Sequence, residues 1–254
     1  PDPIHPERSV CNELIHDLKI DQKGQMWIAT ANGLNRYNPQ NQTFRKWINE
    51  GRNDGSLPNP LIWNLAMDAQ DRLWLSVDNK GLCRYDAATD KFIVYPWREF
   101  VRKTFPERLP DAYLKIYQID QRSPTAFWLQ TNIGVFSFDW KQERFAYHPM
   151  PKSFPIATSV TNCKEETYFG SWYQNLLRYD PCAGEWTQIC IPAPNAPECT
   201  GQHVTNIWPY KGGKLILTQL GIYWLPNGGF QVQAIPGFEH EEEELPRGIV
   251  HKAF

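Results

Sequence analysis

Short runs of alternating apolar and polar residues recur along this chain of 254 residues, separated by turn-forming residues. Within residues 15–47, four such runs begin near Ile15, Met26, Leu34 and Phe44. Between them lie segments rich in Asp, Asn, Gly and Pro, which favour turns. Because no segment sustains an apolar period of 3.6 residues, the pattern predicts four short strands here and few helices anywhere.

The same unit is repeated along the chain. Asp21–Asn38 reads DQKGQMWIATANGLNRYN, and Asp68–Asp86 reads DAQDRLWLSVDNKGLCRYD. More divergent copies occupy Asp120–Asp139, Thr167–Asp180 and Lys214–Leu225. The copies align on Trp27, Trp74, Trp128, Tyr168 and Leu215. Their spacing is 40 to 54 residues, about 47 on average, which is close to the length of a propeller blade.

The phrase D-x-x-G-x-[LM]-W-[IL]-[AGS]-T-x-x-G-[LI]-x-R-[YF]-[DN] resembles the two-component regulator propeller repeat. The resemblance covers residues 14–235 and is most specific in the first two units. The fourth unit has Asn175 in place of the glycine, and the fifth lacks the Arg-Tyr-Asp ending. The resemblance implies the extracytoplasmic sensor region of a bacterial histidine kinase or hybrid two-component system.

The expected fold is therefore all-β, a β-propeller of four-stranded antiparallel blades forming a single domain or segment. The five predicted blades occupy residues 11–48, 62–95, 113–147, 156–191 and 204–235. Gly248–Phe254 resembles the first strand of a sixth, which indicates a segment of a larger propeller. A closed five-bladed ring is the alternative, but the proline-rich first ten residues offer no convincing strand to complete it.

Composition narrows the function classes. The chain is 41% hydrophobic and 14% aromatic with 11 Trp, enough for a packed core of aromatic side chains. The net charge is −2, with acidic and basic residues interspersed, so nucleic acid is not an expected partner. No apolar run approaches the roughly 18 residues that span a bilayer. Since the chain begins with Pro1, we expect a processed or excerpted sequence.

Cysteines and histidines form no recognisable catalytic or metal-binding motif. None of the six cysteines has zinc-type spacing, and the sequence contains no GxSxG, HExxH or P-loop pattern. We therefore predict no catalytic residue, no metal site and no cofactor. Four cysteines lie within Cys163–Cys199, where one disulfide would form in an exported domain. The alternative, which we favour, is that most cysteines are small buried hydrophobes.

Features that repeat are interpreted as structural. Trp27 and its equivalents Trp74 and Trp128 are predicted to pack between blades, and Asp21 is predicted to form a turn rather than a calcium loop. The repeated arginines are predicted to form hydrogen bonds within their blades. They are Arg36, Arg84 and Arg178.

Residues that do not recur in every repeat are better candidates for ligand binding, because binding residues usually lie in the irregular loops of a regular scaffold. The loops between second and third strands share one face of a propeller with the connections between blades. Aromatic rings beside polar groups on that face suit a sugar or peptide, although packing against a neighbouring loop is the alternative. The candidate ligand-binding residues are Trp172, Tyr173, Asp78, Asn79, Trp97, Arg98, Trp63 and Tyr113.

The leading functional hypothesis is a periplasmic, non-enzymatic sensor module. It would bind a small molecule or an oligosaccharide and signal through the remaining blades and a membrane kinase, with homodimerisation as a further expectation. The alternatives are a propeller enzyme acting on a polysaccharide or peptide and a protein-interaction scaffold. Two carboxylates about 5–10 Å apart in the channel would favour the enzyme, and a large apolar patch would favour the scaffold.

Overall fold

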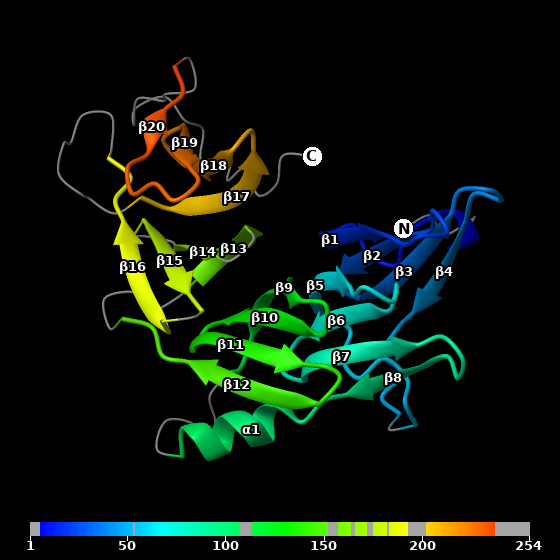
Figure 1. Ribbon diagram of the computed structural model, residues 1–254. Coiled ribbons are helices and arrows are strands. Elements are labelled where there is room, and N and C mark those ends of the chain that lie inside the picture. The colour runs from blue at the N-terminus through cyan, green and yellow to red at the C-terminus, as the bar shows by residue number, and fades with distance from the viewer. Residues whose placement is uncertain are drawn as a thin grey trace. The chain divides into compact units, whose positions relative to one another are not determined.

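The computed structural model describes residues 6–52, 54–106, 113–151, 157–163, 166–171, 175–181, 183–192 and 202–236. These residues form five four-stranded antiparallel sheets, and each strand pairs with the next one along the chain (Figure 1). The predicted sixth-blade strand Gly248–Phe254 lies outside the described residues. In the described part of the chain, no helix is long and apolar enough to cross a membrane.

The strands follow the sequence repeats. The first sheet comprises β1 (Ile15–Ile20), β2 (Met26–Thr30), β3 (Gly33–Asn38) and β4 (Thr43–Trp47). The second comprises β5 (Ile62–Met67), β6 (Leu73–Val77), β7 (Gly81–Asp86) and β8 (Lys91–Val94). The third comprises β9 (Ile116–Ser123), β10 (Ala126–Thr131), β11 (Gly134–Asp139) and β12 (Arg144–His148). The fourth comprises β13 (Ala157–Cys163), β14 (Glu166–Ser171), β15 (Leu176–Asp180) and β16 (Glu185–Ile189). The fifth comprises β17 (Val204–Tyr210), β18 (Gly213–Thr218), β19 (Ile222–Pro226) and β20 (Gln233–Ala234).

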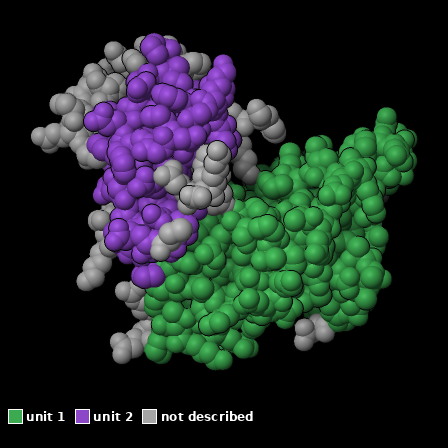
Figure 2. Space-filling view, viewed as in Figure 1, with its two compact units in different colours: residues 1–132, 136–148 green, residues 133–135, 149–254 purple. Residues whose placement is uncertain are grey.

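The chain divides into two compact units (Figure 2). The first holds the first three sheets apart from the start of β11, and the second holds the fourth and fifth sheets. Within the first unit, β1 lies next to β5 and β5 next to β9, so the first strands of successive sheets are neighbours. Within the second unit, β13 and β17 are neighbours in the same way.

The repeated aspartate organises the turn between the first two strands of a sheet. The Oδ1 of Asp21 accepts hydrogen bonds from the backbone N–H groups of Lys23 and Gln25, and its Oδ2 accepts one from the indole of Trp27 at 3.0 Å. In the second sheet, Asp68 makes the equivalent bonds and accepts the Trp74 indole at 2.8 Å. These contacts explain the six-residue spacing from Asp to Trp, and they confirm that Asp21 forms a turn.

Hydrogen bonds also set the charge state of the buried Asp68. Burial favours the neutral form of this carboxyl group, but the bonds from Trp74 and Arg72 outweigh it and hold the pKa of Asp68 below its usual value. Asp68 therefore stays ionised near neutral pH and fixes the Trp74 ring in the core.

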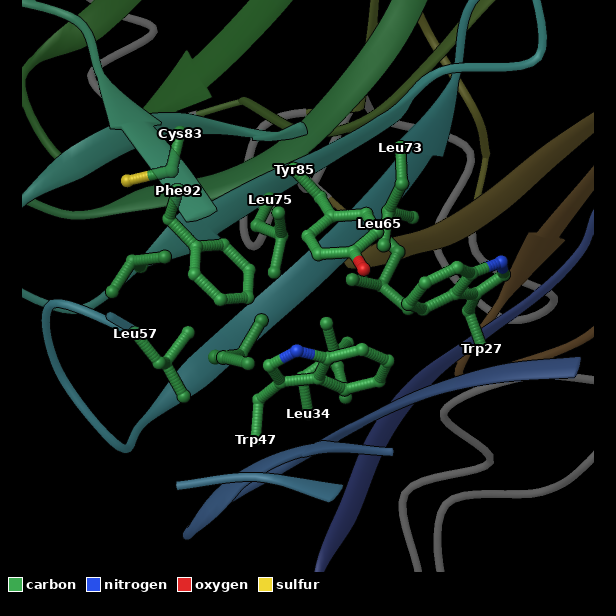
Figure 3. Packing of buried hydrophobic residues seen from close by; sticks show 13 residues of the cluster. Trp27, Leu34, Trp47, Leu57, Leu65, Leu73, Leu75, Cys83, Tyr85 and Phe92 are labelled. Atoms are coloured by element: carbon green, nitrogen blue, oxygen red, sulfur yellow. The ribbon is translucent and has the colours of Figure 1, made fainter. Parts of the chain in front are cut away.

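Aromatic side chains fill the space between the first and second sheets (Figure 3). The ring centroids of Trp27, Trp47 and Tyr85 are mutually 5.3–5.4 Å apart, and aliphatic residues such as Leu65 surround them. Trp27 is 4% exposed, and Trp74 and Trp128 are fully buried, so the prediction that these tryptophans form the core is confirmed. A second core, which includes Ile216, packs between the fourth and fifth sheets.

A buried polar chain links the first strands of the first three sheets. The Oδ2 of Asp17 in β1 accepts hydrogen bonds from the side chain of Asn64 in β5 at 2.6 Å and from the backbone N–H of Leu65 at 2.9 Å. The Oδ1 of Asn64 then accepts the backbone N–H of Ile119 in β9 at 2.8 Å. The pairing register shifts between Ile15 and Asp17 in β1 and between Ile62 and Asn64 in β5, so a bulge lies immediately before each side chain that reaches the neighbouring sheet.

The long connection after the second sheet contains a helix, α1 (Trp97–Thr104). Trp97 and Val101 are buried, and the Trp97 ring lies 4.6 Å from that of Phe136. Trp97 also packs on Gly81, which has a φ of +84°; a Cβ atom at this position would lie 2.4 Å from the Trp97 Cδ1. Trp97 is thus a core residue and does not present its ring to a ligand, in contrast to our expectation.

Candidate functional site

Three of the predicted residues meet at one end of the second and third sheets. Trp63 lies on β5, Asp78 lies in the turn between β6 and β7, and Tyr113 precedes β9. One oxygen of Asp78, Oδ1, accepts hydrogen bonds from the Trp63 indole at 2.8 Å and from the Tyr113 hydroxyl. The structure therefore brings these three residues together as a bonded group, on the face formed by second-to-third-strand turns and inter-sheet connections.

Backbone hydrogen bonds hold this face in place. The N–H of Asp78 donates to the carbonyl of Leu61 at 2.9 Å, and the N–H of Asn132 donates to the carbonyl of Lys115 at 3.2 Å. Each of these bonds ties a turn to the residue that enters the first strand of the same sheet. The arrangement fixes the side chains of the turns relative to those on the first strands.

Two further residues cover the Trp63 ring. The His16 ring stacks on it with centroids 4.8 Å apart and planes 11° apart, while its Nδ1 is 2.7 Å from the carbonyl oxygen of Ile62. The Nζ of Lys115 lies 3.0 Å from the Trp63 ring centroid. The two groups would clash on one side of the ring at these distances, so they lie on opposite faces. Trp63 therefore positions its neighbours and does not offer a free face for stacking.

Lys115 has an unusual environment for a cation. Its Nζ is also 4.7 Å from the centroid of the Tyr117 ring, and contact with two aromatic rings partly replaces hydration of the ammonium group. Burial lowers the pKa of Lys115 to about 8, and the charge of Asp78 opposes that shift. Burial, followed by the hydrogen bond to Asp78, raises the pKa of Tyr113 to about 12. The site thus combines a titratable amine, a carboxylate and phenol rings.

We call this group the Trp63 cluster. It consists of His16, Trp63, Asp78, Tyr113, Lys115 and Tyr117. Sequence reasoning missed His16, Lys115 and Tyr117. Aligning the repeats on their first strands would have placed His16, Trp63 and Tyr117 at one equivalent position, just before the polar residue of each strand. No sequence pattern indicates the role of Lys115, because that role depends on its contact with Trp63 in the neighbouring sheet.

The other predicted residues do not join the cluster. Arg98 on α1 donates a hydrogen bond to the side chain of Asn79 in the turn that also carries Asp78. Asn79 has a φ of +54° and is exposed. The hydrogen bond between Arg98 and Asn79 therefore connects α1 to the turn between β6 and β7. Trp172 and Tyr173 lie outside the described residues.

The cluster is suited to binding. Half-exposed Tyr113 offers an aromatic surface, Lys115 offers a cation and Asp78 offers an acceptor. In the part of the chain that the structure describes, no group of three or more His, Cys, Asp or Glu side chains is placed to hold a metal ion. Such a combination of flat rings and polar edges favours recognition of a small hydroxylated or charged ligand.

Solved structures show which fold this arrangement belongs to. The extracellular domain of BT3049 from B. thetaiotaomicron, named as a hybrid two-component system, is 18% identical with a TM-score of 0.69; the match covers 89% of this chain and 30% of that one. The extracellular domain of BT4673 from the same organism, named as a one-component system, is 16% identical with a TM-score of 0.67, over 90% of this chain and 29% of that one. The β-propeller domain of Cps50 (Swd1) from Myceliophteria thermophila is 12% identical with a TM-score of 0.59, over 89% of this chain and 72% of that one. The fold is a β-propeller. No family model matches the sequence, and the search of curated proteins gave no match.

The similarity confirms the predicted all-β propeller fold with four-stranded blades. Each described sheet is therefore one blade, and β1, β5 and β9 are the first strands of the first three blades. The chain spans about a third or less of the length of the two B. thetaiotaomicron structures. The Trp63 cluster lies at one end of neighbouring first strands and includes residues of adjoining loops, and loops held by a rigid scaffold often carry binding residues.

Proposed function

We propose that this chain is part of the extracytoplasmic ligand-binding region of a two-component signalling protein, and that the Trp63 cluster contacts an oligosaccharide. The observation that carries the proposal is the cluster itself, in which Tyr113, Lys115 and Asp78 combine a stacking surface with a cation and an acceptor. Two similar structures are extracellular domains of proteins named as two-component or one-component systems, which supports the sensor role.

A disulfide supports the extracytoplasmic location. Cys190 is disulfide-bonded, whereas Cys11 and Cys83 are free. Disulfides persist in oxidising compartments such as the periplasm and are rare in the cytosol. The disulfide at Cys190 is an exception to the favoured interpretation that most cysteines are small buried hydrophobes, whereas the buried Cys83, whose pKa burial raises to about 12, fits it.

Signalling follows from differential binding. A ligand shifts the equilibrium between two states of a sensor only by the difference in its affinity for them. The Trp63 cluster draws His16 from the first blade, Trp63 and Asp78 from the second, and Lys115 from the third. Ligand contact there would favour one arrangement of three neighbouring blades. The remaining blades, a membrane-spanning histidine kinase and a homodimer interface would transmit that preference.

Oligosaccharide binding is the first test. We would titrate a panel of neutral and acidic oligosaccharides into the exported region of the protein by calorimetry, with wild type, Tyr113→Ala and Lys115→Met compared. Loss of the aromatic surface or of the cation is expected to weaken binding at least about tenfold, because interface energy concentrates in such residues. The matched control is Lys211→Met, which removes an ammonium lying 5.1 Å from the centroid of the Tyr210 ring, in blade five.

Each outcome of this titration has a defined meaning. Unchanged affinity in Tyr113→Ala and Lys115→Met would remove the Trp63 cluster from the site. Loss of binding only in a Trp172→Ala, Tyr173→Ala double variant would move the site to blade four. No binding of any sugar by the wild type would contradict the oligosaccharide proposal and favour a protein partner. Conversion of the sugar to a product would show an enzyme.

The pH dependence of binding is a second expectation. The pKa of Lys115 is about 8, so its ammonium is largely charged at pH 7 and largely neutral at pH 9. A ligand that accepts a hydrogen bond from this ammonium is therefore expected to bind several-fold more tightly at pH 7 than at pH 9. Lys115→Met should remove that difference. If the affinity of Lys115→Met fell between pH 7 and pH 9 as much as that of wild type, the pH dependence would belong to another group.

A further inference from the structure

A pocket of about 250 Å³ lies between the first and second blades, at the end opposite to the Trp63 cluster. It is bordered by the turns that follow β1, β5 and β7, whereas the cluster uses the turn that follows β6. Alternate turns of an antiparallel blade lie at opposite ends, so the two sites are on opposite faces. The charged lining residues are Asp21, Lys23, Arg36, Asp71, Arg72, Arg84 and Asp86. We call this the Arg84 pocket.

The carboxylates of the Arg84 pocket already have partners. Asp21 accepts hydrogen bonds from two backbone N–H groups and from the Trp27 indole. Asp86 accepts the backbone N–H of Ala88 at 3.2 Å and the hydroxyl of Thr89 at 2.6 Å, and these two bonds, led by that from Thr89, lower its pKa. Asp71 accepts the backbone N–H of Gln22. The carboxylates of Asp21, Asp71 and Asp86 thus accept hydrogen bonds from residues of the turns around the pocket.

The guanidinium groups of the pocket are only partly satisfied. The Nε of Arg72 donates to the Oδ2 of Asp68 at 2.6 Å, but other donors lack partners. The Nε of Arg84 and the Nη2 of Arg72 are buried without a hydrogen-bond partner in the part of the chain that the structure describes. Arg36 is held by aromatic contacts, with its Cζ 5.2 Å from the Trp27 ring centroid, and the Arg84 Cζ is 5.9 Å from that of Trp74. The Nε of Arg84 therefore lacks the intrablade hydrogen bond that we expected. The rings orient these side chains and leave their N–H donors for another acceptor.

We propose that the Arg84 pocket binds a compact tetrahedral oxyanion, the sulfate or phosphate group of a small ligand. The pocket has an excess of donors, and an oxyanion supplies only acceptors, so it complements the unpaired Arg84 and Arg72 atoms. Guanidinium forks match the geometry of sulfate and phosphate oxygens, and a tetrahedral oxyanion presents oxygens in several directions to the arginines that line the pocket from two blades. Buried N–H groups without an acceptor are costly, so binding would also stabilise the fold.

The test titrates sodium sulfate, sodium phosphate and sodium acetate into the exported region of the protein by calorimetry, at constant ionic strength. Wild type is expected to bind sulfate or phosphate saturably with a dissociation constant of about 1 mM or tighter, and acetate more weakly. Arg36→Gln with Arg84→Gln should weaken binding at least about tenfold. The matched control is Arg122→Gln, because Arg122 also lies over a repeat tryptophan, 4.8 Å from the Trp128 ring centroid, but outside the pocket.

The proposal is overturned if wild type shows no saturable binding of sulfate or phosphate, if acetate binds most tightly, or if the double variant binds as wild type does. Equal weakening in Arg122→Gln would show a general charge effect and would also overturn it. If the double variant does not fold, Arg84→Lys is tested instead, because lysine keeps the positive charge but lacks the paired N–H donors of the guanidinium group. Unchanged oxyanion affinity in Arg84→Lys would contradict the proposal. Lys115→Met should leave oxyanion binding intact, which separates this site from the Trp63 cluster.

Discussion

Replacing Trp74 with alanine is expected to lower the free energy of unfolding by about 3–5 kcal/mol, the usual cost of removing a large buried aromatic side chain. Trp74 is fully buried, and its ring packs 5.2 Å from Tyr95 and 5.3 Å from Phe127 of the next blade. The substitution opens a cavity between two blades and removes the indole donor from Asp68. Chemical denaturation followed by fluorescence and circular dichroism measures the change.

Two variants make this result specific. Trp74→Phe keeps most of the ring volume but loses the hydrogen bond to Asp68, so its loss of stability should lie well below that of alanine. Tyr210→Ala, at a residue that is 44% exposed, should change stability little. If Trp74→Ala cost less than about 1 kcal/mol, the inter-blade core would not depend on the repeated tryptophan.

The repeated part of the fold is encoded locally, and for that reason the sequence predicts it well. Asp21 and Trp27 are six residues apart because one carboxylate both closes the turn and accepts the indole N–H. The same spacing in Asp68 and Trp74 identifies the second blade. Alternating apolar residues then place the strands, since each blade buries large side chains against its neighbours.

The candidate site is encoded less locally. Asp78 could be singled out because its turn is longer and more polar than the equivalent turns, and Trp63 and Tyr113 because they are aromatic residues near strand starts. Their shared hydrogen bonds, however, depend on how two blades meet. Lys115 gains its role from a ring in another blade, 3.0 Å away, which no sequence spacing reveals. Trp97 was predicted to contact a ligand because it lies in a long, irregular connection rich in aromatic and basic residues. The structure instead buries its ring, because this connection contains a short helix.

The polar chain through Asp17 shows how the blades depend on one another. The Asp17 side chain is 2% exposed, and besides its bonds to Asn64 and Leu65 it accepts the Leu18 N–H at 2.8 Å and pairs with Lys19 Nζ at 3.2 Å. Removing this acceptor leaves several buried donors without partners at once. Such a loss affects three neighbouring blades, because Asn64 in turn holds the backbone of β9.

Asp17→Ala is therefore expected to lower the free energy of unfolding by about 3 kcal/mol, within the range for breaking a buried, hydrogen-bonded charge. Asn64→Ala should also destabilise the protein, and the double variant should cost about 1–2 kcal/mol less than the sum, since the two side chains are bonded to each other. Denaturation midpoints of the four proteins provide the cycle, with exposed Asp54→Ala as the control that leaves stability near wild type. Strict additivity would mean that Asp17 and Asn64 act separately, and the first strands would then be held together by apolar packing alone.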